Sequence, residues 1–158
     1  MANIIHNVLF VCIHNSARSQ MAEEFLKKYG GNLFHAESAG IEPGKLNPNV
    51  VQVLKEEGID ISHKETRDVF DLFRRGKMYN AVITVCDEAS AERCPIFPGV
   101  VKRLAWSFAD PSTFTGTPEE ILQQTRKVRD EIKQKILEFI KTGSQLNYWT
   151  GLATAENK

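Results

Sequence analysis

The sequence predicts a single α/β domain built on a four-stranded parallel sheet with helices on both faces. Short apolar runs, which suit strands buried on both faces of a parallel sheet, alternate with longer stretches whose apolar residues recur at helical spacing. The length of 158 residues, with 42% apolar and 25% charged side chains, is typical of one compact domain. Successive strands joined through helices are expected to run parallel, with right-handed crossovers.

The elements can be placed one after another along the chain. The expected strands cover residues 7–11, 33–39, 81–85 and 100–108. The expected helices cover residues 19–29, 47–57, 68–75 and 117–143, with a short helical or looped segment at 87–93. The clearest start signals are Asn47-Pro48, an N-cap followed by proline at the first helical position, and a capping box from Thr117 to Glu120. Residues 1–143 then form the domain, and 144–158 a weakly specified C-terminal tail of unknown role.

Charge and hydropathy exclude several classes of protein. Twenty basic and twenty acidic side chains cancel, so the overall charge attracts neither nucleic acid nor an anionic membrane. The apolar stretch at 8–12 is far shorter than a signal peptide or a membrane-spanning helix requires. We therefore expect a cytoplasmic protein without a nucleic-acid or membrane partner.

The three cysteines, Cys12, Cys86 and Cys94, are too few and odd in number for a secreted disulfide framework. Buried, inert thiols are the simplest alternative, and zinc is disfavoured because neither a C-x2-C spacing nor a histidine pair occurs. However, Cys12, Cys86 and Asp110 all follow predicted strands. Because ligands bind beyond the carboxyl ends of parallel strands, these groups should gather at one edge, which argues for chemistry.

The segment from Cys12 to Ser19 has the features of an oxyanion-binding loop. It places a thiol and the Arg18 guanidinium six positions apart, on a turn from a strand into a helix. A helix N-terminus attracts anions, and arginine can bind two oxygens of a phosphate-shaped ligand, so both should favour the thiolate of Cys12. Ser19 could donate a hydrogen bond to the Cys12 sulfur, and Asn15 suits a left-handed turn. The expected ligand-binding residues are Ile13, His14, Asn15, Ser16, Ala17, Arg18 and Ser19.

Several ordered blocks then carry a resemblance to a known family. They are 18–23, 38–41, 46–48, 58–62, 85–86, 94–95, 106–111 and 128–132. With Cys12 to Ser19 they resemble the low-molecular-weight tyrosine phosphatase superfamily, whose fold opens with C-x5-R-S, and more narrowly the thioredoxin-coupled arsenate reductases. His14 stands where that superfamily has glycine, and Ala17 where many members have a second loop cysteine. The spacing from Cys86 to Cys94 is one residue longer than in related reductases.

The resemblance implies reduction of arsenate to arsenite. Cys12 would attack arsenate held by Arg18 and the loop amides, with Asp110 as the general acid, and phosphate or sulfate would bind as analogues. Cys86 would then attack Cys12, and Cys94 would attack Cys86. Thioredoxin, or alternatively glutathione with glutaredoxin, would reduce the resulting disulfide, and no tightly bound cofactor is expected. Three thiols suit a two-electron reduction better than they suit ester hydrolysis, which needs only one nucleophilic cysteine.

The spacing of the last two cysteines predicts a conformational change. If residues 86 to 94 formed an unbroken helix, the two cysteines would lie about 12 Å apart along its axis. A disulfide tolerates at most about 7 Å between Cα atoms. We therefore expect residues 87–93 to unwind or loop out when this disulfide forms.

Two other functions remain open. A tyrosine phosphatase could use the same loop and acid, although Ser112 and Thr113 stand where phosphatases of this superfamily usually have aromatic residues. Because the aromatic residue Phe114 follows them directly, the phosphatase alternative stays open. A phosphocysteine carrier or a redox-sensing module would not need Arg18, Asp110 and two further thiols together.

Four polar residues resemble positions that bind potassium in some reductases. They are Asn15, Glu23, Ser38 and Asp68. A solvated or structural role is the simpler interpretation of each, and we assign no metal.

Overall fold

The computed structural model describes residues 4–150 and contains a four-stranded parallel sheet, as the sequence predicts. The strands lie in the order β2-β1-β3-β4, so β1 occupies a central position. Their bounds are β1 (His6–Cys12), β2 (Phe34–Gly40), β3 (Ala81–Thr84) and β4 (Lys102–Ala105). In the register of the sheet, Cys12 pairs with Gly40 of β2, and Val11 pairs with Thr84 of β3. The carboxyl ends of these three strands therefore meet at one edge.

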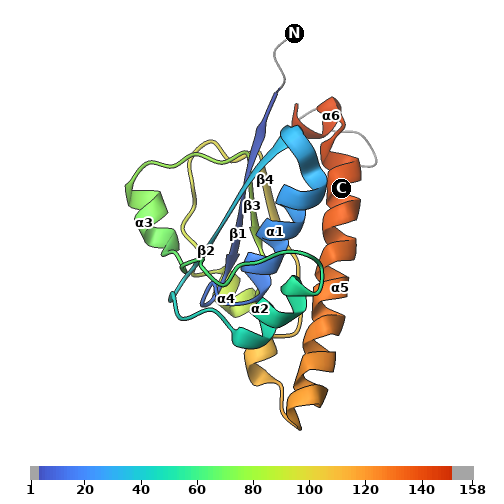
Figure 1. Ribbon diagram of the computed structural model, residues 1–158. Coiled ribbons are helices and arrows are strands. Elements are labelled where there is room, and N and C mark those ends of the chain that lie inside the picture. Colours follow the sequence, from blue (N-terminus) through green and yellow to red (C-terminus); the bar gives the residue numbers. More distant parts are fainter. Residues whose placement is uncertain (1–3, 151–158) are drawn as a thin grey trace.

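Helices follow the strands along the chain (Figure 1). They are α1 (Arg18–Gly30), α2 (Pro48–Lys55), α3 (Val69–Arg74), α4 (Glu88–Ala91), α5 (Pro118–Gly143) and α6 (Leu146–Trp149). Two short 3-10 turns, η1 (Gly31–Leu33) and η2 (Pro111–Thr113), complete the order. No helix within residues 4–150 is long and apolar enough to cross a membrane.

The sheet separates two apolar layers. Val8, Phe10 and Cys12 of β1 belong to the larger layer, which includes the buried faces of α1 and α5. Leu9 and Val11 point the other way, into a smaller layer with residues of α3, because successive side chains of a strand alternate between faces. Figure 1 shows α1 and α5 side by side on one side of the sheet and α3 on the other. The prediction of helices on both faces is thus confirmed.

Local signals explain where the helices begin. Thr117 and Glu120 form the predicted capping box at the start of α5, each side chain bonded to the other's backbone amide. Asn47 caps α2 through the amide of Asn49, with Pro48 at the first helical position. Asp68 caps α3 through the amide of Phe70.

Two segments differ from the expectation. β4 has four residues instead of the nine predicted, because it pairs only with β3, which itself spans Ala81–Thr84. The predicted tail contains a helical turn, α6, whose Trp149 is buried and stacks on His6 at 4.1 Å between ring centroids. The sequence pattern around Trp149 does not reveal which residue it packs against, so its contact with His6 could not be predicted.

Candidate active site

The loop that follows β1 is held from outside by backbone hydrogen bonds. The carbonyl groups of Cys12, Ile13, His14 and Ser16 accept from the amides of residues 41, 42, 44 and 47, at 2.7–3.1 Å. In a trans peptide unit the carbonyl and the next amide point in opposite directions. The amides of residues 13, 14, 15 and 17 therefore point inwards, where an anion can accept hydrogen bonds from them.

Gly40 allows this close contact between β2 and the loop. A Cβ atom at Gly40 would lie 2.8 Å from the backbone nitrogen of Asn15, the carbonyl carbon of His14 and the oxygen of Ile13. All three are backbone atoms that cannot move aside easily. The side chain of His14 also links the loop to the segment after β2, because its Nδ1 lies 2.8 Å from the carbonyl oxygen of Glu42.

The Cys12 sulfur receives two polar contacts at the centre of the loop. The amide of Asn15 donates to it at 3.2 Å, and the Ser19 hydroxyl lies 2.8 Å away. Because Ser19 Oγ already accepts a hydrogen bond from the side-chain amide of Asn15 at 2.8 Å, its own hydrogen is free to point towards the sulfur. Both contacts stabilise a thiolate. Ser19 thus lies within hydrogen-bonding distance of the Cys12 sulfur, as expected from the sequence.

Asn15 is a buried residue that adopts a left-handed conformation. Its φ of 55° is the only positive value at a non-glycine residue within 4–150. Gln20 and the amide of Arg67 both donate to its side-chain oxygen, at 3.1 and 3.0 Å. These long-range contacts hold the turn that brings the Asn15 amide to the sulfur.

Arg18 and Asp110 meet beside the loop. Arg18 is only 5% exposed, and its guanidinium donates to the carbonyl of Phe108 at 3.2 Å. Its Nη2 lies 3.5 Å from Oδ2 of Asp110. The other carboxylate oxygen of Asp110 accepts from the amide and hydroxyl of Ser112, at 3.0 and 2.9 Å, which orients the side chain. Although β4 ends five residues earlier, Asp110 thus reaches the same edge.

The N-terminus of α1 adds to the attraction for an anion. The N-cap residue is Ala17, which has no side-chain oxygen to accept from the first amides of the helix. These amides carry the positive end of the helix dipole. The sequence cysteine-x5-arginine thus folds into a site with inward amides, a helix N-terminus and a guanidinium around one sulfur.

The two other thiols lie on different faces of the sheet. Cys86 is buried in the same apolar layer as Cys12, whereas Cys94 belongs to the layer beside α3. Burial, followed by the nearby Cys12, raises the pKa of Cys86 to about 11. Burial likewise raises the pKa of Cys94. Both are therefore neutral thiols at pH 7.

The model of the low-molecular-weight phosphotyrosine protein phosphatase family matches residues 7–147. The chain belongs to this family. Within the family it is similar to arsenate reductases. That of Bacillus licheniformis is 46% identical over 138 residues, which cover 86% of this chain and 96% of that protein.

Solved structures of the family agree with the observed fold. A structure described as an arsenate reductase in the phosphate binding state has a TM-score of 0.70 and 28% identity, covering 87% of this chain and 98% of that one. A thioredoxin-dependent arsenate reductase of Corynebacterium glutamicum has a TM-score of 0.64 and 28% identity, covering 89% of this chain and 62% of that one. The family match extends beyond residue 143, where the resemblance was expected to end.

Some residues of the site were not among those expected. Gly40 and Gln20 entered the sequence-based prediction only as parts of the family blocks 38–41 and 18–23. Gln20 donates to the backbone and side-chain oxygens of Asn15, at 3.0 and 3.1 Å. Its place in a family block directly after the loop was the only signal in the sequence, because its hydrogen-bond partners are recognisable only in the folded chain.

Proposed function

We propose that this protein reduces arsenate to arsenite, using Cys12 as the nucleophile and thioredoxin as the electron donor. The observation that carries the proposal is the Cys12 sulfur, held by Ser19 and the Asn15 amide inside a loop of inward amides. The similarity to arsenate reductases over 86% of the chain supports the choice of oxyanion.

Arsenate binds in the loop as a tetrahedral anion. The inward amides and the buried guanidinium of Arg18 bind its oxygens, and the N-terminus of α1 adds a favourable field. The binding residues in this proposal are Ile13, His14, Asn15, Ser16, Ala17, Arg18 and Ser19. Phosphate and sulfate have the same shape and act as competing analogues.

The first chemical step joins sulfur to arsenic. The Cys12 thiolate attacks, an As–O bond breaks, and Asp110 in its protonated form donates a proton so that water leaves. The position of Asp110 supports this role, because its Oδ2 lies 3.5 Å from Arg18 beside the loop and the Ser112 hydrogen bonds to Oδ1 orient the carboxyl group. Arsenic is still in the As(V) oxidation state after this step.

The second step transfers the electron pair. Cys86 attacks the Cys12 sulfur, the S–As bond breaks, and its two electrons remain on arsenic, which leaves as arsenite. The nearby Cys12 is one cause of the raised pKa of Cys86. Burial is the larger cause and remains after the Cys12 sulfur has bonded to arsenic, so Cys86 must lose its thiol proton as it attacks, and this proton passes to an oxygen of the departing arsenite.

The third step frees Cys12. Cys94 attacks Cys86, which forms a Cys86–Cys94 disulfide and releases Cys12 as a thiolate. Because Cys86 and Cys94 belong to different apolar layers, residues 87–93 must rearrange before the two sulfurs can meet. Thioredoxin then reduces this disulfide, in a cytoplasmic setting where thiols stay reduced. Glutathione with glutaredoxin is the alternative donor.

A matched set of cysteine variants tests the proposal. Arsenate-dependent oxidation of NADPH is measured with thioredoxin and thioredoxin reductase for the intact chain and for Cys12→Ser, Cys86→Ser and Cys94→Ser. We expect turnover only in the intact chain, because each serine interrupts the relay. The Cys94→Ser variant should still release about one arsenite per protein, with a Cys12–Cys86 disulfide as the product.

A phosphatase would give the opposite pattern. The same loop and Asp110 could hydrolyse a phosphate ester through Cys12 alone, with no need for Cys86. Rapid hydrolysis of an aryl phosphate, unaffected by Cys86→Ser and without arsenate turnover under any thiol donor, would contradict the proposal. Continued cycling of Cys94→Ser with thioredoxin would contradict only the third step.

A further inference from the structure

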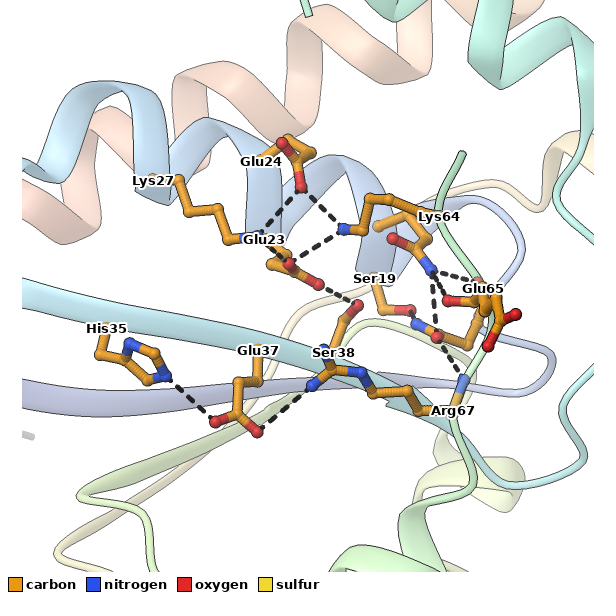
Figure 2. Close-up of polar contacts among 12 residues, drawn as sticks. Ser19, Glu23, Glu24, Lys27, His35, Glu37, Ser38, Lys64, Glu65 and Arg67 are labelled. Atoms are coloured by element: carbon orange, nitrogen blue, oxygen red, sulfur yellow. Dashed lines mark hydrogen bonds and ion pairs between the residues drawn. The ribbon is translucent and has the colours of Figure 1, made fainter. Parts of the chain in front are cut away.

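The four residues that resemble a potassium site have other partners in this chain. The carboxylate of Glu23, which is only 4% exposed, accepts from the Ser38 hydroxyl at 2.5 Å. Lys64 Nζ lies 2.9 Å from Oε2 of the same carboxylate, and Lys27 contacts it as well (Figure 2). Lys64 also reaches Glu24 at 2.7 Å. Two carboxylates and two ammonium groups thus neutralise one another.

Two further oxygens of that set also accept hydrogen bonds. The side-chain oxygen of Asn15 accepts from Gln20 and from the Arg67 amide, and an oxygen of Asp68 caps α3. Gln20 Oε1 is buried and has no hydrogen-bond partner in the part of the chain that the structure describes, but it is a single neutral oxygen. A potassium ion at Glu23 would meet the Lys64 ammonium at short range, and like charges repel. These residues therefore do not fit a bound potassium ion.

The charge balance around Glu23 supports this conclusion. Burial opposes ionisation of Glu23, but the charge of Lys64 and the hydrogen bonds from Lys27, Ser38 and Lys64 hold its pKa below the usual value. The side chain of Lys64 is itself 17% exposed, so this ion pair is shielded from bulk water. The buried carboxylate thus already has its counter-ion.

Lys64 begins the short segment that holds the oxyanion loop. Three residues later, the amide of Arg67 donates to Asn15 and its carbonyl accepts from the amide of Gly40 at 2.8 Å. Asn15 in turn contacts both Cys12 and Ser19. The ion pairs of Lys64 with α1 therefore anchor one end of a segment whose other end fixes Asn15.

We propose that Lys64 is a positioning residue for the oxyanion loop, and that its ammonium group makes a bound potassium ion unnecessary in this protein. The ion pairs with Glu23 and Glu24 hold residues 64–67 against α1. The Arg67 backbone then keeps Asn15 in its left-handed conformation, with its amide directed at the Cys12 sulfur. This inference rests on the proposed function, but of the measurements that test it only KM and kcat require arsenate reduction.

The test compares Lys64→Met with Lys64→Arg and with Lys27→Met. Lys27 contacts the same carboxylate but lies on α1 itself, so its loss leaves residues 64–67 anchored. We measure KM and kcat for arsenate, phosphate binding by calorimetry, and thiolate absorbance at 240 nm and pH 7 with Cys12→Ser as the baseline. Each is measured in potassium chloride and in tetramethylammonium chloride at equal ionic strength.

For the intact chain we expect the same values in both salts. Lys64→Met should raise KM and weaken phosphate binding about tenfold, with a smaller change in kcat, because loop geometry is lost. It should also lower the thiolate absorbance. Lys64→Arg should keep most of the phosphate affinity and thiolate absorbance of the intact chain. Potassium chloride should restore much of what Lys64→Met loses. Lys27→Met should give values close to those of the intact chain.

Three results would overturn the inference. They are a potassium requirement in the intact chain, an unchanged Lys64→Met variant, and equal losses in Lys64→Met and Lys27→Met. The salt comparison on the intact chain needs no variant, so a folding defect cannot obscure it. Phosphate binding and thiolate absorbance need no arsenate turnover, so failure of the proposed reaction would be recognised separately.

Discussion

Gly40 lies at the end of β2, opposite Cys12 and against the backbone of the oxyanion loop. Its missing side chain lets the loop run close enough for residues 41, 42, 44 and 47 to bind the loop carbonyls. Single residues of this kind determine the geometry of the site without contacting a ligand. Their effect is on the direction of the inward amides.

Replacing Gly40 should therefore damage binding more than folding. In Gly40→Ala the new Cβ would lie 2.8 Å from three backbone atoms, so the loop must shift. We expect phosphate affinity, measured by calorimetry, to fall by at least tenfold, since misplaced groups cost that much or more. The matched control is Gly44→Ala, whose Cβ would lie at an ordinary 3.4 Å from the His14 side chain. Equal affinity in the two variants would contradict this account.

The sequence brought together the residues of the oxyanion loop but not the residues that support the loop. Cys12, Arg18 and Ser19 lie within one short motif, so a local pattern was enough to associate them. Gly40, Gln20 and Lys64 act through contacts with residues 5 to 45 positions away, and several of these contacts are with backbone atoms. Such partners have no signature in composition or periodicity.

At the scale of elements, α4 is the least anchored part of the site. It has four residues, and the following turn is held by local bonds from the amides of Arg93 and Cys94 to the carbonyls of Ser90 and Ala91. Its Asp87 cap is exposed, and Arg93 pairs with Glu42 between two exposed side chains. Exposed pairs of this type contribute little stability.

Oxidation should therefore release α4 while the sheet stays intact. After one arsenate turnover without thioredoxin, amide hydrogen exchange in residues 87–94 is expected to become at least about tenfold faster, because the local bonds open. Exchange in β1 and α5 should not change. The Cys94→Ser variant, which stops at the Cys12–Cys86 disulfide, serves as the control and should keep its protection. A Cys86–Cys94 disulfide with unchanged exchange would exclude the rearrangement.

Helices and strands with strong local sequence signals were predicted most accurately. α5 was predicted with its capping box, and α2 with its Asn47-Pro48 start, because both signals lie within four residues. The length of β4 depends on how many residues of β3 it can pair with, which periodicity does not encode. The turn at α4 was predicted only as helical or looped, since proline after Cys94 sets its end but not its conformation.

Across the whole molecule, β1 connects two functionally different ends. Cys12 lies at its carboxyl end, and His6 at its amino end stacks on Trp149 of α6. The Trp149 indole donates to the carbonyl of Gly143 at 2.8 Å, which closes α6 against the end of α5. The buried Nδ1 of His6 has no hydrogen-bond partner within residues 4–150. This end contributes to stability and not to chemistry.

Stability should fall in weak acid through His6. Burial lowers the pKa of His6, so the folded protein binds this proton less readily than the unfolded chain does. The free energy of unfolding should be unaffected by His6 well above pH 6.5 and should decrease below it, by at most about 1.4 kcal/mol per pH unit. Urea unfolding from pH 7.5 to 5 would measure this. His6→Phe keeps an aromatic ring against Trp149 and should show a smaller decrease; an equal slope would contradict the assignment.

The oxyanion loop is held by hydrogen bonds from a neighbouring backbone segment to its carbonyls, so its shape does not depend on contacts with a ligand. A rigid cradle of this kind recognises charge and tetrahedral shape, which arsenate shares with phosphate, and it has no means of preferring the scarcer anion. In the proposed mechanism, selectivity comes after binding, from the attack of the second thiol. Only an arsenic centre accepts the electron pair when the bond to sulfur breaks, so phosphate should act as a competitive inhibitor that slows the cycle without consuming reducing equivalents.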